Sequence, residues 1–109
     1  MGVTKNNLFT DSQNRIAALA KALGHPARIA ILERLLVDNA CICGDLVDVL
    51  PLSQSTISQH LKALKEAGII TGEIEGVKTC YCINPNVWEE AQIIFVNLFQ
   101  KHQCCTPKT

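Results

Sequence analysis

Apolar residues near the start of the chain recur with the period of a helix. They fall three and four positions apart, which places them on one helical face: Ile16, Leu19, Ala20 and Leu23. Thr10 and Gln13 stand at capping-box spacing before this run, and Gly24 follows it as a suitable stop. The pattern therefore predicts a first helix that begins near residues 10–12 and ends near residue 23.

Three further helical segments follow. Pro26 suits the first turn of the second, in which we expect Ile29, Leu32 and Leu36 on one apolar face and Arg28, Glu33 and Arg34 in solvent. A break at residues 39–40 and a short segment at 41–43 lead to a third helix over about 44–50, which Pro51 ends. The fourth is predicted over 54–67, with Gly68 as its terminator.

Beyond Gly68 the apolar pattern changes to alternation, which predicts a two-stranded hairpin over 69–75 and 78–83. The last segment, about 86–102, is again helical but is apolar over more than one stripe. A surface helix needs a stripe of only about 100°. We therefore expect this helix to be buried on two sides, one of them against another subunit; the alternative is burial wholly inside its own core.

These elements define a single domain over residues 1–109, with 1–9 and 103–109 as flexible tails. The fold class is mainly α with a small β-hairpin, in the order helix–helix–helix–helix–hairpin–helix, a winged helix-turn-helix. Hydrophobic residues make up 48% of the 109. A chain of this size buries only about 60–70% of its unfolded surface alone, so this apolar content also favours a partner subunit.

Residues 51–53 form a connection of the length that a helix-turn-helix uses. Ser53 can cap the helix that follows. On a helical wheel with about 100° per residue, the core side of that helix carries Ile57, Leu61 and Leu64. The opposite side carries short polar side chains and lysines.

That polar side is suited to DNA. No acidic residue occurs between Ser53 and Lys65, whereas ordinary solvated helix faces are rich in Glu as well as Lys and Arg, which is the alternative interpretation. Glutamine can pair with adenine, and lysines suit phosphates. The predicted contacts are Gln54, Ser55, Thr56, Ser58, Gln59, His60, Lys62 and Lys65 on the helix and Lys78 near the hairpin tip. His60 borders the apolar side, so a partly buried histidine bonded to the scaffold is an equally good interpretation for it.

Charge and targeting signals further restrict the functional class of the protein. Ten basic and ten acidic residues give a formal net charge of +0, which argues against a general polyanion binder. The first residues carry no long apolar run, so we expect no signal peptide or membrane span and a cytoplasmic location with reduced cysteines. No catalytic constellation is visible; a thiol oxidoreductase, for example, would require a Cys-x-x-Cys pair. We therefore expect a protein that is not an enzyme.

Residues 52–62 (LSQSTISQHLK) closely resemble the recognition-helix motif of the ArsR family of metal-responsive repressors. Residues 22–32 (ALGHPARIAIL) are similar to that family's second-helix signature, and 67–70 and 75–78 match its helix end and wing. The resemblance covers about residues 15–84. It implies a winged helix-turn-helix homodimer, paired through its first and last helices, on a palindromic double-stranded DNA operator with half-sites about one turn apart.

The same family includes members that bind soft metal ions through a Cys-x-Cys pair beside the third helix. Cys41 and Cys43 lie in that neighbourhood, one residue earlier than in the metal-sensing arrangement, so that Gly44 occupies the second cysteine's place. Cys104 and Cys105 in the tail could complete a site. Thiolates suit As(III), Cd, Pb, Cu(I) or Zn, and such an ion would act as an inducer.

Cys80 and Cys82 complete the six cysteines, and we expect them exposed on the strand face opposite Tyr81 and Ile83. The alternative is that free cysteines fill space as small hydrophobes. The sequence thus predicts a homodimeric repressor that a soft metal or thiol modification releases from DNA. The remaining alternatives are a winged-helix regulator without metal sensing and a thiol-rich metal-binding or buffering protein.

Overall fold

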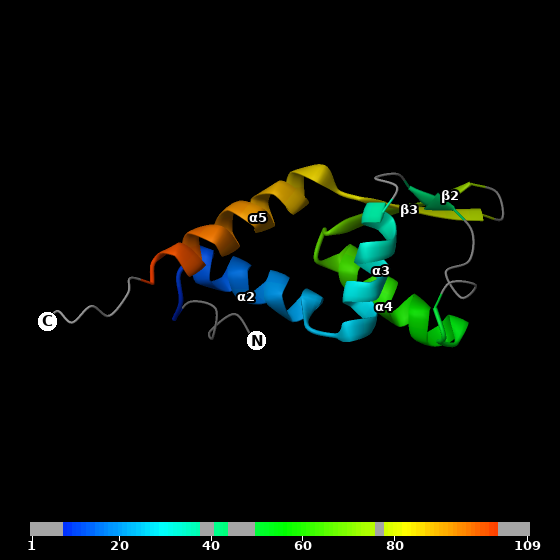
Figure 1. Cartoon of the computed structure of the whole chain (residues 1–109), viewed down its shortest axis with the longest axis horizontal. Coiled ribbons are helices and arrows are strands. Elements are labelled where there is room, and N and C mark those ends of the chain that lie inside the picture. The colour runs from blue at the N-terminus through cyan, green and yellow to red at the C-terminus, as the bar shows by residue number, and fades with distance from the viewer. Residues whose placement is uncertain (1–7, 38–40, 44–49, 76–77, 103–109) are drawn as a thin grey trace, which may run out of the picture.

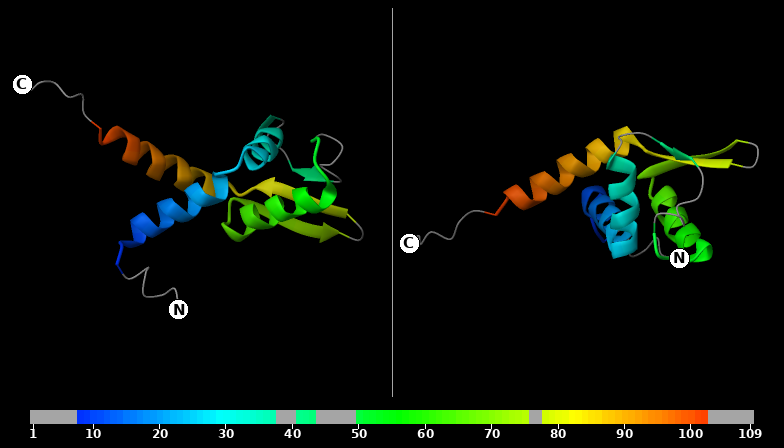
Figure 2. Two further views of the ribbon diagram at one scale, coloured as in Figure 1. Left: turned by 90° about the horizontal axis from the view of Figure 1, so that it is seen from below. Right: turned by 45° about the vertical axis from the view of Figure 1, so that its right-hand side comes forward.

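The computed structural model describes residues 8–37, 41–43, 50–75 and 78–102. In chain order its elements are α2 (Asp11–Leu23), α3 (Pro26–Val37), β1 (Ile42–Cys43), α4 (Gln54–Glu66), β2 (Ile70–Glu75), β3 (Lys78–Ile83) and α5 (Pro85–Gln100). Figures 1 and 2 show α2 and α5 extending together to one end of the molecule, with α3, α4 and the sheet at the other. The mainly helical winged fold expected from the sequence is confirmed.

The helix starts follow their local signals. Thr10 forms the predicted capping box, because its hydroxyl accepts from the Gln13 N–H at 3.0 Å and the Gln13 side-chain oxygen accepts from the Thr10 N–H at 3.0 Å. Pro26 begins α3, and Pro85 begins α5 after the Asn84 cap. Four of the five predicted helices therefore begin within about a residue of where the sequence places them. The remaining one, the third in chain order over 44–50, falls almost wholly outside the described residues.

Within the described part of the chain the sheet has three strands in the order β1–β3–β2, one more than the predicted hairpin. β2 and β3 form that hairpin, and Ile70 pairs with Ile83 at its base. The additional strand β1 is antiparallel to β3, with Ile42 opposite Tyr81 and Cys43 opposite Cys80. The sequence treats 41–43 as a lead-in to a helix, because two strand residues are too few for an alternating pattern.

The core lies between α2, α3, α4 and the base of β2. Its buried members are Leu19, Ala22, Ile31, Leu32, Leu35, Ile57, Leu61, Leu64, Ile69 and Ile70. The expected apolar face of α3 is wrong in detail, because Ile29 and Leu36 are exposed at 40% and 38%. The helix is rotated so that Ile31, Leu32 and Leu35 face the core instead.

Helix α5 packs along α2 but contributes no fully buried residue. Its exposed apolar side chains are Ile93, Val96, Leu98 and Phe99, the last at 70%. Arg15 of α2 holds both carboxylate oxygens of Glu90 at 2.8 Å, a partly exposed pair of modest energetic value. The alternative that α5 is wholly enclosed in its own core is thus wrong, and one apolar side of the helix is left open.

Gly68 separates α4 from β2 with φ +83°, a left-handed conformation that side chains with a Cβ rarely adopt. Its N–H donates to the Lys65 carbonyl at 2.9 Å, and the next N–H, of Ile69, donates to the Leu64 carbonyl at 3.1 Å. The helix end is therefore closed by a tight reversal, which directs the chain at once into the sheet. No helix among the described residues is long and apolar enough to span a membrane.

Candidate nucleic-acid interface

Helix α4 presents a polar edge to solvent at one end of the molecule. The exposed members of this edge are Gln54, Ser55, Ser58, Gln59, Lys62 and Lys65. Its other side is held by Ile57, Leu61 and Leu64, which are 3%, 6% and 0% exposed. The core contacts thus fix which face of α4 is free, and we call that free face the reading edge.

The first turn of α4 is closed by hydroxyl groups. Ser53 accepts from the Thr56 N–H at 3.3 Å and donates to the Thr56 hydroxyl at 2.9 Å, with the Ser55 hydroxyl 3.3 Å away. Thr56 is half-buried in this arrangement. Of the predicted contact residues it is therefore tied into the cap, while Ser55 stays exposed beside a helix N-terminus that favours negative charge.

His60 lies within α4 but faces inward, with 8% of its surface exposed. Arg28 of α3 donates from Nε to its Nδ1 at 3.1 Å, and the His25 ring lies with its centroid 4.4 Å away. Since Nδ1 accepts this bond, the imidazole is neutral and its proton sits on Nε2. This geometry favours the scaffold interpretation of His60 over a phosphate contact.

Arg28 connects three helices through this contact. Its Nη1 donates to the Ala22 carbonyl at 3.1 Å and the Lys21 carbonyl at 3.4 Å, at the end of α2. Burial, then the nearby His25 and Arg28, lower the pKa of His60 below its usual value. The sequence placed Arg28 in solvent; the structure makes it a half-buried hydrogen-bond link between α2, α3 and α4. Only the pairing of His60 with Arg28 across 32 positions reveals this role.

The hairpin expected to act as a wing is formed by β2 and β3. Lys78 is the first residue of β3 and pairs in register with Glu75. Residues 76–77 lie outside the described part of the chain, as does the Lys78 side chain. Its phosphate contact stays a prediction.

The cysteines differ from expectation. Cys41 is joined to Cys82 by a disulfide, with their Cα atoms 4.3 Å apart. Cys80 is a disulfide cysteine as well, and Cys80 and Cys82 are half-buried, not exposed. The physical reason is β1, whose pairing with β3 brings residue 41 opposite residue 82.

The predicted soft-metal ligands are thus only partly placed. Cys41 is engaged in the disulfide, whereas Cys104, Cys105 and the side chain of Cys43 lie outside what the structure describes. No group of three His, Cys, Asp or Glu side chains suited to a metal occurs among the described residues.

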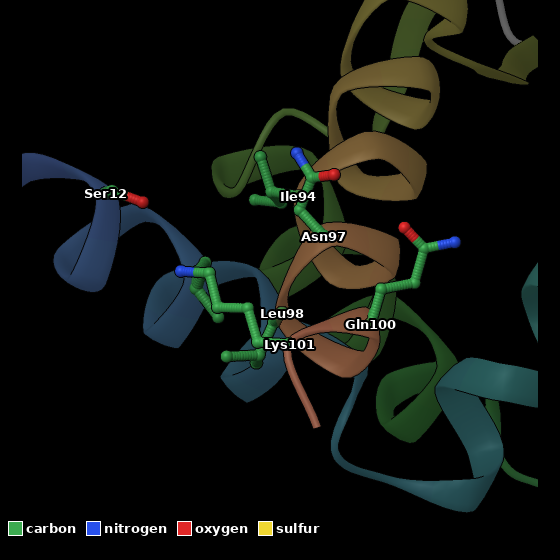
Figure 3. Close-up of a pocket in the computed structure, with 7 residues that line it drawn as sticks. Ser12, Ile94, Asn97, Leu98, Gln100 and Lys101 are labelled. Atoms are coloured by element: carbon green, nitrogen blue, oxygen red, sulfur yellow. The ribbon is translucent and has the colours of Figure 1, made fainter. Parts of the chain in front are cut away.

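Two cavities lie at the α2–α5 end, away from the reading edge. One, of about 400 Å³, is lined by side chains of both helices: Ser12, Ile16, Ile94, Asn97, Leu98, Gln100 and Lys101 (Figure 3). The other, of about 420 Å³, is an apolar groove lined by Leu23, Trp88, Ala91, Gln92, Phe95, Val96 and Phe99. Neither includes a residue of α4, so neither takes part in the reading edge.

Comparison with known proteins agrees with this geometry. A family model described as a helix-turn-helix domain matches residues 23–73. The HTH-type transcriptional repressor SmtB of Mycobacterium tuberculosis is 46% identical over 63 residues, which are 58% of this chain and 46% of that protein. The chain thus spans about half the length of this relative. An arsenical resistance operon repressor of Staphylococcus xylosus is 33% identical over 73 residues, 67% of this chain and 69% of that repressor.

Among solved structures, an ArsR-like transcriptional regulator from Rhodococcus sp. RHA1 superposes with a TM-score of 0.69. The superposition covers 84% of this chain and 86% of that one at 20% identity, so it supports the fold alone. The sequence relatives and the matched segment both indicate a helix-turn-helix regulator, and the exposed polar face of α4 is consistent with one. The chain belongs to the ArsR/SmtB family of helix-turn-helix transcriptional regulators.

Proposed function

We propose that this chain is a homodimeric repressor that binds a palindromic operator with α4 in the major groove. The observation that carries the proposal is the reading edge: an exposed helix face of serines, Gln59 and lysines without an acidic residue from Ser53 to Lys65. Short hydroxyl side chains permit close approach to base edges, and a glutamine can pair with adenine through two hydrogen bonds. In the proposed complex Lys62 and Lys65 contact phosphates, which set register without reading sequence.

The open side of α5 supports the dimer. Its exposed Val96 and Phe99 line the apolar groove of about 420 Å³, and Ile93 on the same helix is exposed as well. An exposed apolar surface of this kind marks an interaction site. Pairing two copies there would cover the patch and present two reading edges to one duplex.

The formal net charge of +0 means that overall charge attraction contributes little to the affinity of the proposed protein–DNA complex. Between Ser53 and Lys65 the local charge is +2, from Lys62 and Lys65. Affinity then depends on two copies of α4 more than on bulk attraction. We expect log K to fall with log salt by about −0.9 for each phosphate neutralised, with only a few phosphates per subunit.

The inducer belongs to the proposal as well. Relatives include a repressor named for arsenical resistance, and thiolates are suitable ligands for As(III), Cd, Pb, Cu(I) or Zn. Cys41 and Cys82 are close enough for both sulfurs to hold one ion once the bond between them is reduced. Further ligands would come from Cys43, Cys104 or Cys105. Binding to a chromosomal operator places the protein in the cytoplasm.

A selection experiment tests the DNA half. The full chain is used to enrich duplexes from a random-sequence pool, and affinities for the selected duplex are measured by fluorescence anisotropy. Gln59→Ala should weaken binding about 5–150-fold for each half-site, because a good bidentate base contact contributes about 1–3 kcal/mol of discrimination. Glu33→Ala, an exposed change on α3, is the control and should bind as the wild type. Unselective binding, or a Gln59→Ala variant equal to the wild type, would contradict the assignment of the reading edge.

A further inference from the structure

Two histidines and an arginine meet where α2, α3 and α4 join. The His25 and His60 rings lie with their centroids 4.4 Å apart and their planes tilted by 45°. In each ring Nδ1 accepts a hydrogen bond, for His25 from the Ala27 N–H at 3.0 Å and for His60 from the Arg28 Nε at 3.1 Å. Both contacts therefore require a neutral imidazole whose single proton is on Nε2.

The contact with Arg28 excludes a second proton on His60. A guanidinium has five N–H donors, no acceptor and a permanent positive charge. A proton taken up from solvent by neutral His60 would bind at Nδ1, the same atom that accepts from Arg28. The contact would then bring two donors and two positive charges together at 3.1 Å. Protonation of His60 and its bond to Arg28 are thus mutually exclusive.

Within the described part of the chain, no acidic side chain acts on His60. The charged and titratable groups that face it there are Arg28 of α3 and His25 of the turn between α2 and α3. Helix α2 contributes only backbone carbonyls, which accept from Arg28, and Lys62 on α4 itself is exposed to solvent. Burial first, and then His25 and Arg28, lower the pKa of His60 below its usual value. The surroundings of His60 therefore favour its neutral form.

The burial of His60 couples its charge to the orientation of α4. Only 8% of its surface is exposed, and a charged imidazolium is disfavoured at a buried position. Gln59, the adjacent residue, is exposed on the reading edge. Successive side chains stand at fixed angles of about 100° around a helix axis. A roll of α4 that brings His60 towards solvent therefore turns Gln59 by the same angle, away from its place on the reading edge.

We propose that Arg28 and His60 are positioning residues for the reading edge, and that they hold α4 in its DNA-binding orientation only while His60 is neutral. The proposal rests on the proposed repressor function and adds the proton to it as a regulator. Arg28 and His60 contact neither base nor phosphate in this scheme. They act through the placement of Gln59 and the other residues of the reading edge.

The sign of the pH effect separates this mechanism from general electrostatics. Protonation of exposed histidines makes a protein more positive, which strengthens its attraction to phosphates. Positioning by neutral His60 predicts the opposite result, weaker binding in acid. An apparent dissociation constant is the intrinsic one divided by the fraction of competent protein, so a dimer that needs both subunits should bind about fourfold more weakly when half of His60 is protonated.

The test measures affinity and protonation together. A labelled duplex is selected by the full chain at pH 8, and fluorescence anisotropy gives its affinity from pH 8 to pH 5.5 at constant ionic strength. NMR of the histidine ring protons follows the protonation of His60 over the same range. The dissociation constant should be constant while His60 is neutral, rise about fourfold at its midpoint and rise further below it. Saturating duplex should lower the pKa of His60, because the bound form excludes the proton.

Two variants of His60 separate positioning from titration. In His60→Asn the side-chain oxygen stands near the place of Nδ1 and can accept from Arg28, but the group does not titrate. In His60→Leu the acceptor is lost. His60→Asn should therefore bind the duplex more tightly than His60→Leu at pH 8, and it should lose the acid response. His102→Asn is the matched control. His102 is exposed just beyond the end of α5, which points away from α4 (Figure 1), and its loss should leave the acid response unchanged.

Three results would overturn the proposal. One is a wild-type affinity that stays constant or increases while NMR shows His60 becoming protonated, a result that needs no variant to fold. Another is a folded His60→Asn protein that keeps the full acid loss. The third is an acid loss that only accompanies a loss of helix in circular dichroism. If no duplex is selected at pH 8, the repressor function itself fails, and NMR still shows whether proton uptake breaks the contact with Arg28.

Discussion

Replacing Arg28 with methionine removes the side-chain hydrogen bonds that join α3 to α4 and to the end of α2, while keeping a side chain of similar length. The wild-type guanidinium donates to His60 at 3.1 Å and to the Ala22 carbonyl at 3.1 Å, with a longer contact to the Lys21 carbonyl. Methionine can make none of these bonds. It also leaves the buried Nδ1 of His60 without its donor.

The magnitude follows from these contacts. A hydrogen bond to a charged group contributes about 1.5–3 kcal/mol, and an unsatisfied buried acceptor costs about 1–3 kcal/mol. Because Arg28 is only half-buried, we expect the free energy of unfolding to fall by about 2–4 kcal/mol. With an unfolding entropy of about 2.1 cal/mol/K per residue, that loss lowers Tm by about 9–17 °C.

The pH dependence supplies an independent readout. The folded protein holds the pKa of His60 below its usual value, first by burial and then by His25 and Arg28. The unfolded chain therefore binds more protons than the fold as pH falls below about 6.5, the unperturbed histidine value. Stability from neutral His60 is complete above that pH and is lost as the pH falls towards the folded pKa. In Arg28→Met one of the causes that lowers the pKa is gone, so this acid sensitivity should be smaller.

Guanidinium unfolding followed by circular dichroism at pH 8 and pH 5.5, at one fixed protein concentration, measures both effects. Arg34→Met is the matched control, since Arg34 is exposed in the last turn of the same helix, and it should change stability by no more than about 0.5 kcal/mol. If Arg28→Met were as stable as Arg34→Met at pH 8, the role assigned to Arg28 would be refuted.

Other substitutions test separate parts of the structure. Leu64→Ala empties a site with 0% exposure and should cost about 2–5 kcal/mol in chemical denaturation; a loss below about 1 kcal/mol would mean that the core is elsewhere. Gly68→Ala forces a Cβ into φ +83° and should cost about 1–2 kcal/mol, seen as a lower Tm than that of Ala67→Gly. Phe99→Glu places a charge on a side chain that is 70% exposed. It should shift dimer to monomer in analytical ultracentrifugation with an unchanged helical spectrum, and a variant that remains dimeric would contradict the interface on α5.

Local sequence patterns were enough to predict most of the fold. Thr10 and Gln13 predicted a capping box that the structure contains, because both of its hydrogen bonds lie within one turn. The inward side of α4 was predictable for the same reason, since Ile57, Leu61 and Leu64 repeat at helical spacing. Exposure of the reading edge follows directly from that inward side.

The features that the sequence did not reveal depend on contacts between residues that are far apart in the chain. Arg28 looks like an ordinary solvated cation until His60, 32 positions away, is placed beside it. β1 is visible only through its pairing with β3. The Cys41–Cys82 bond follows from that pairing, and an argument from the reducing cytoplasm pointed to free thiols instead. The rotation of α3 is also a tertiary effect. It is set by the packing of Ile31, Leu32 and Leu35 against the core, which the apolar pattern of the helix alone does not define.

The ring closed by Cys41 and Cys82 also changes how the chain comes apart. A protease that cuts once between these residues leaves two fragments that stay covalently joined, so the nicked protein keeps its full mass on a non-reducing gel. Only a reductant separates the pieces. The segment proposed to contact DNA can thus be cut without being lost, and the gel mobility of nicked protein reports whether its disulfides are closed.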